Sequence, residues 1–63
     1  MIVATFYRWL PGGEAEVATE DGLLLAVSAR VLAAGSFRQL RVGQQVAIEL
    51  TPSGTVTSIH LPN

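Results

Sequence analysis

The chain contains no cysteine and no lysine, and each absence narrows what it can do. Without cysteine there can be no disulfide, no thiolate metal site and no thiol nucleophile. Small secreted domains usually depend on disulfides, so we expect a reducing, cytoplasmic location. The basic side chains are four arginines, which five acidic residues outnumber, giving a net charge of −1. A chain of this charge has no general attraction for the phosphates of nucleic acid.

Charged residues of any kind are also scarce: they make up 14% of the 63 residues, whereas 49% are hydrophobic. This length predicts one domain, residues 1–63, that buries only about 60% of its unfolded surface. The remaining apolar surface favours association, either as a homodimer or with a protein partner. The N-terminus lacks a basic segment, and Arg8 and Pro11 interrupt its apolar residues. We therefore expect neither a signal peptide nor a membrane partner.

Residues that carry out catalysis or bind metals are few and isolated. His60 is the only histidine, and Ser28 and Ser36 have no nearby base. Glu14 and Glu16 lie two apart on an expected strand, which places them about 6–7 Å from each other. No third polar group accompanies them, so we interpret them as solvated or as paired with an arginine, for which Arg8 across the strands is suitable. The sequence predicts no enzyme, metal, cofactor or small-molecule substrate.

Alternating and β-branched segments separated by turn residues predict five strands. The expected strands are Ile2–Leu10, Glu14–Thr19, Leu23–Val27, Val46–Leu50 and Thr55–Leu61. A short helical turn is expected at Ala29–Ala34, with Ser28 as its N-cap and Gly35 as its end. It would lie in the long connection after the third strand.

This order of strands predicts a small antiparallel barrel, because an open sheet of this size would leave its edges exposed. Alternation in the second strand places Ala15 and Val17 on the core side and Glu14 and Glu16 on the other. The expected core consists of Phe6, Val17, Leu23, Leu25, either Val31 or Leu32, Val46, Ile48, Leu50 and Ile59.

Several strings resemble the bacterial cold-shock domain, a five-stranded barrel of the OB type. Residues 4–11 are similar to the family's opening Gly-Thr-Val-Lys-Trp-Phe-Asn-Pro, and residues 23–29 to its third strand, Val-Phe-Val-His-Phe-Ser-Ala. Residues 35–49 resemble Gly-Phe-Arg-Ser-Leu-x-x-Gly-Gln-x-Val-x-Phe-Glu, and residues 59–62 the closing Val-Arg-Leu-Pro. The resemblance spans nearly the whole chain and is strongest at residues 37–49 and 61–62. It implies an all-β, OB-type barrel.

The resemblance also implies binding of single-stranded RNA or DNA, in which exposed aromatic rings stack on bases beside basic side chains. The family's second strand reads Lys-Gly-Phe-Gly-Phe-Ile, whereas residues 12–17 place Glu14 and Glu16 at the two stacking positions. The third strand carries Leu24, Ala26 and Val27 in place of Phe, His and Phe. Each stacked base contributes about 1–3 kcal/mol, so the replacements predict weak binding. The remaining candidates are Tyr7, Arg8, Trp9, Phe37 and Arg38.

Two functions therefore stay open. One is weak binding of single-stranded nucleic acid through those five residues. The alternative is a protein-interaction or homodimerising module that has lost nucleic-acid binding. Its expected patch combines apolar side chains with carboxylates that would pair with arginines of a partner: Trp9, Glu14, Glu16, Leu24 and Val27.

Overall fold

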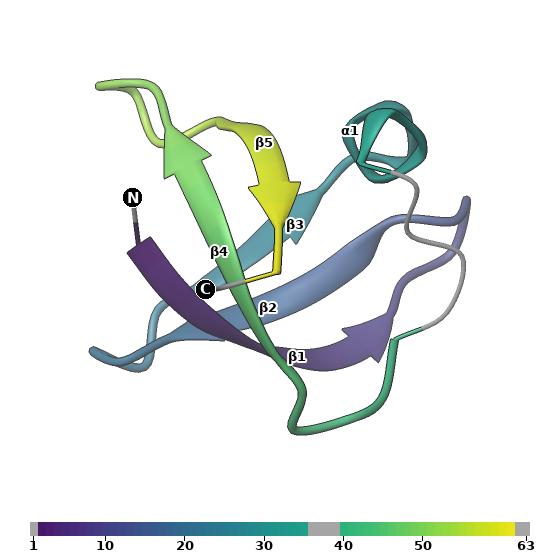
Figure 1. Cartoon of the computed structure of the whole chain (residues 1–63), viewed down its shortest axis with the longest axis horizontal. Coiled ribbons are helices and arrows are strands. Elements are labelled where there is room, and N and C mark those ends of the chain that lie inside the picture. The colour runs from purple at the N-terminus through teal and green to yellow at the C-terminus, as the bar shows by residue number, and fades with distance from the viewer. Residues whose placement is uncertain (1, 36–39, 62–63) are drawn as a thin grey trace.

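A computed structural model describes residues 2–35 and 40–61 of the chain (Figure 1). Five strands and one short helix account for most of these residues. In chain order they are β1 (Ile2–Trp9), β2 (Ala15–Thr19), β3 (Leu24–Val27), α1 (Ala29–Ala34), β4 (Gln45–Leu50) and β5 (Val56–His60). The predicted strands and helical turn are all present, and no end differs by more than one residue from its predicted position.

The strands form a single antiparallel sheet in the order β3-β2-β1-β4-β5, so β1 lies at its centre. The sheet is strongly curled, in the manner of a half-barrel around the core (Figure 1). Strands β3 and β5 stand at the two ends of the hydrogen-bonded order. Helix α1 follows β3 directly and packs near β5, so it covers part of the opening between the two end strands. The structure thus has the coarse form that the sequence predicted, a small antiparallel barrel-like sheet.

Helix α1 has the predicted boundaries because both of its ends are satisfied by local hydrogen bonds. The Val31 N–H donates to Ser28 Oγ (3.2 Å), which caps the first turn. The Gly35 N–H donates to the Val31 carbonyl (3.1 Å) where the helix ends. Only Leu32 on the helix is fully buried, so α1 contributes to the core through one side chain.

The core lies on the concave side of the sheet and confirms most of the expected positions. Members of the predicted set that are buried are Phe6, Val17, Leu32, Val46, Ile48 and Ile59, and those packed against them in part are Leu25, Val31 and Leu50. Ala15, which alternation placed on the core side, is buried as well, and four further residues outside the predicted set are also buried: Ala4, Val27, Leu40 and Val56. These additions are mostly small side chains or residues next to turns.

Leu23 was predicted to be buried, and this prediction is wrong: it is 58% exposed. The residue precedes β3 and belongs to the hairpin after β2, where the Thr19 N–H donates to its carbonyl (2.9 Å). Gly22 adopts a φ of 84°, a conformation that glycine reaches without strain, and its N–H donates to the Thr19 carbonyl (2.9 Å). Leu23 therefore ends the turn at the rim of the sheet.

Candidate functional site

A β-bulge in β1 decides how the candidate side chains are arranged. Phe6 pairs with Val17 on β2, but the next pair joins Arg8 with Glu16, so β1 has one extra residue at Tyr7. A bulge of this kind interrupts the strict alternation of side chains. Its consequence is that Tyr7 and Arg8 lie together, with the Arg8 Cζ atom 5.8 Å from the centre of the Tyr7 ring. This geometry is a cation–π contact.

Arg8 is also held from the neighbouring strand. Its Nε donates to Glu16 Oε1 at 2.7 Å, which confirms the predicted cross-strand pair. The Arg8 side chain is 61% exposed, whereas that of Glu16 is 15% exposed. The hydrogen bond to Glu16, aided by the charge of that carboxylate, raises the pKa of Arg8 above its ordinary value. The guanidinium therefore keeps its charge throughout the physiological pH range.

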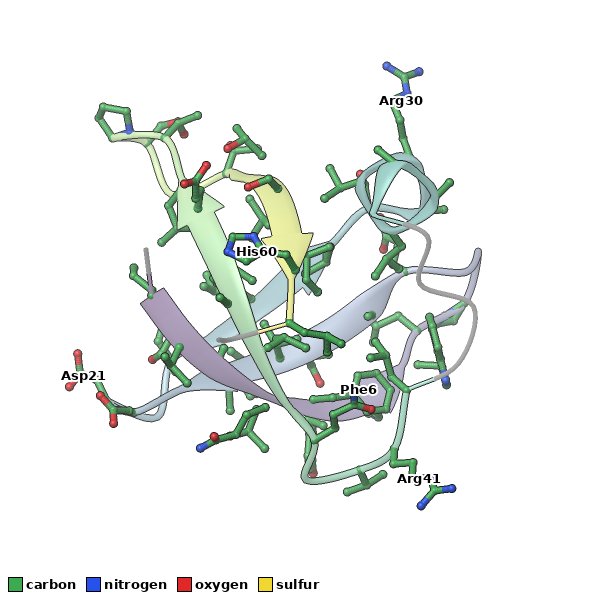
Figure 2. All side chains as sticks on the ribbon, in the orientation of Figure 1. Phe6, Asp21, Arg30, Arg41 and His60 are labelled. Atoms are coloured by element: carbon green, nitrogen blue, oxygen red, sulfur yellow. The ribbon has the colours of Figure 1, made fainter. Side chains whose placement is uncertain are left out.

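The Trp9 side chain lies on the core side of the sheet, opposite to Tyr7 and Arg8, because regular alternation resumes after the bulge. It pairs with the buried Ala15, and its ring centre is 5.3 Å from that of Phe6 with an interplanar angle of 59°. The side chain is still 43% exposed. One part of the indole thus covers Phe6, which Figure 2 labels within the sheet, and another part reaches solvent at the rim.

The convex face of the β1–β2–β3 half of the sheet carries the rest of the candidate site. We call this the outer face, formed by Thr5, Tyr7, Arg8, Glu16, Ala18, Leu24 and Ala26. The strand register places its members in two rows: Arg8, Glu16 and Ala26 form one, and Thr5, Ala18 and Leu24 form the other. Only Tyr7 contributes an aromatic ring to this face. The remaining positions are small, aliphatic or charged.

Two of the predicted patch residues are placed differently from expectation. Val27 pairs with Ala15 and is fully buried, so it cannot belong to an exposed patch. The reason is the alternation of β3, which turns Leu24 and Ala26 outward and Val27 inward. Glu14 is partly buried just before β2, where its carbonyl accepts the Leu10 N–H (2.7 Å). Phe37 and Arg38 lie outside the described residues.

Leu23 is an exposed residue that the sequence analysis assigned to the core instead of the surface. It adjoins Leu24, which is 50% exposed, so two leucines face solvent where β3 begins. The signal was present in the sequence, because Leu23 directly follows the Asp21–Gly22 turn and turn residues are usually at the surface.

Within residues 2–35 and 40–61 there is no cluster of side chains suited to a metal ion and no enclosed pocket. The described residues form a single helix, α1, and its six residues are too few to cross a membrane. No family model, curated protein or solved structure matches the chain.

Proposed function

We propose that the chain is a small OB-type, cold-shock-like module that binds single-stranded nucleic acid weakly. The observation that carries the proposal is the unit formed by Tyr7 and Arg8, an exposed aromatic ring beside a guanidinium. The sheet order β3-β2-β1-β4-β5 and the curl of the sheet agree with a barrel of this type. The proposed site lies on the central strand, β1.

Each part of this unit has a chemical use. Tyr7 is 52% exposed and offers a ring on which one base can stack. The Arg8 bond to Glu16 uses Nε, and among the described residues its two terminal nitrogens make no hydrogen bond. Those nitrogens can donate to a phosphate oxygen while the Nε bond fixes the direction of the side chain. Trp9 supplies a second ring at the rim for a neighbouring nucleotide.

The same surface explains why the binding is weak. Stacking is worth about 1–3 kcal/mol per base, so one or two bases supply at most about 6 kcal/mol. Affinity at this level corresponds to dissociation constants of tens of micromolar to millimolar. Glu16 repels phosphate from the same face, and the net charge of −1 adds no attraction at long range.

The test is a titration of labelled oligo-rU and oligo-dT, followed by fluorescence anisotropy at low salt. We expect saturable binding in the high micromolar range, weakened about tenfold or more by Tyr7→Ala because one stacking contact is lost. Leu61→Ala is the matched control, since Leu61 is also exposed but follows β5, which β4 separates from β1. Absence of binding up to millimolar protein, with the fold intact by circular dichroism, would overturn the proposal.

A protein-interaction module is the second candidate, and one observation favours it. Leu23 and Leu24 form an exposed apolar pair at the start of an end strand. Of the other residues expected in its patch, Trp9 is exposed and Glu14 and Glu16 are partly buried, whereas Val27 is fully buried and cannot take part.

A further inference from the structure

Strand β3 has one edge that forms no hydrogen-bonded strand pair among the described residues, although part of β3 lies close to β5 across the opening of the sheet. It hydrogen-bonds to β2 and stands at the end of the sheet order. The Thr19 N–H donates to the Leu23 carbonyl, so Thr19 and Leu23 form a hydrogen-bonded pair of the β2–β3 ladder. Hydrogen-bonded and non-hydrogen-bonded pairs alternate along an antiparallel ladder, so the N–H and C=O groups of Leu24, the next residue, point away from β2. An edge of this kind is a template for pairing with another strand.

The sequence of this edge lacks the usual protection against pairing. Residues 23–27 contain no charge, proline or glycine, and two exposed leucines lie at their start. Natural edge strands are commonly blocked by lysine, proline or an inward charge. The β3 edge is therefore suited to main-chain pairing with an uncharged strand.

We infer that the occupant of this edge is a second copy of the chain, joined by antiparallel pairing of β3 with β3 about a two-fold axis at Leu24. In such a pair the two copies of Leu24 exchange both backbone hydrogen bonds. Their side chains meet on the outer face, and Leu23 of each copy lies opposite Leu25 of the other. The contact is self-complementary, as a two-fold dimer requires.

Charge complementarity supports a second copy as the occupant. The exposed hairpin residues Glu20 and Asp21 precede β3, and the exposed Arg30 follows it on α1. Figure 2 shows Asp21 and Arg30 on opposite sides of the molecule. Antiparallel pairing of two copies brings the acidic hairpin of each toward Arg30 of the other. A parallel arrangement would instead bring like charges together.

The predicted dimer is weak, because four-residue strands bury little surface. Contacts below about 1,200 Å² in total are typical of transient association. We expect a dissociation constant of roughly 0.1–1 mM, which sedimentation equilibrium or NMR diffusion can measure at high protein concentration. This inference does not depend on nucleic-acid binding, because the Tyr7–Arg8 unit lies on another strand.

Two variants test the contact itself. Leu24→Lys should raise the dissociation constant at least about tenfold, because two lysines would face each other across the axis. Val42→Lys adds the same charge at an exposed position away from β3 and should leave association nearly unchanged. Circular dichroism would confirm that both variants fold.

Charge reversal tests the orientation. Arg30→Glu should weaken the dimer severalfold, and adding Asp21→Arg in the same chain should restore it, because the opposite charges meet again with exchanged signs. A strict monomer at about 2 mM protein, association unaffected by Leu24→Lys, or open-ended assembly in place of a dimer would overturn the inference. Tyr7→Ala separates the two proposals, since it removes the stacking ring on β1 and should weaken nucleic-acid binding while association through β3 stays unchanged.

Discussion

Tyr7, Arg8 and Glu16 show how a single inserted residue changes the chemistry of a strand face. Regular alternation along β1 would place Tyr7 and Arg8 on opposite faces, but the bulge between Phe6 and Arg8 places them together. The sequence predicted the partnership of Arg8 with Glu16 from their opposite charges on neighbouring strands. It did not predict the bulge, because no glycine marks it and the pairing with β2 depends on distant residues.

Glu16→Gln tests whether this carboxylate limits binding. The substitution removes the negative charge beside Arg8, so affinity for single-stranded oligonucleotides should rise about three- to tenfold at low salt. Anisotropy titration of labelled oligo-rU measures the change. Glu49→Gln is the matched control, because it removes the same charge from β4, where Glu49 accepts a hydrogen bond from Ser58 (3.1 Å). An equal rise in both variants would show that net charge alone matters.

The positions of the strands and the helix were easier to predict from the sequence than whether the residues near their ends are buried or exposed. Alternation correctly placed Ala15 and Val17 in the core because β2 is covered on one side along its length. It failed in β3, whose residues are apolar throughout, so the sequence pattern could not tell the buried Val27 from the exposed Leu24. Only pairing with β2 fixes which of them faces the core.

Helix α1 and the start of β3 supply a prediction at the scale of elements. Leu32 anchors α1 in the core, so Leu32→Ala should destabilise the fold by about 2–5 kcal/mol. Leu23→Ala makes the same chemical change at an exposed position and should cost less than about 0.5 kcal/mol. Urea unfolding followed by circular dichroism compares the two variants. Similar losses would mean that Leu23 is buried as the sequence alone suggested.

The whole molecule combines a small apolar core with few charged residues, so apolar contacts contribute more than charge to its stability and to any association. The described residues contain no buried polar or charged side chain, so the interior is stabilised by apolar packing. At 63 residues the expected stability is only about 3–9 kcal/mol. Composition predicted this apolar character. It could not locate the edge of β3 that we propose as the site of self-association, because that edge arises from strand order.

The small number of basic residues also predicts that nucleic-acid binding depends only weakly on salt concentration. With one or two phosphate contacts, the logarithm of the binding constant should fall with the logarithm of salt concentration at a slope of about −0.7 to −1.4. Titrations at several salt concentrations measure this slope. A slope steeper than about −3 would require a larger basic surface than the Tyr7–Arg8 unit provides.

The most direct measurement of the central claim is a titration of isotope-labelled protein with oligo-rU, followed by amide NMR shifts. We predict that the largest shifts cluster at Tyr7, Arg8 and Glu16 and extend to Trp9, while residues of β5 stay unchanged. Tyr7→Ala should reduce the shifts at the remaining positions. Shifts that are absent at millimolar RNA, or that are confined to β4 and β5, would contradict the account.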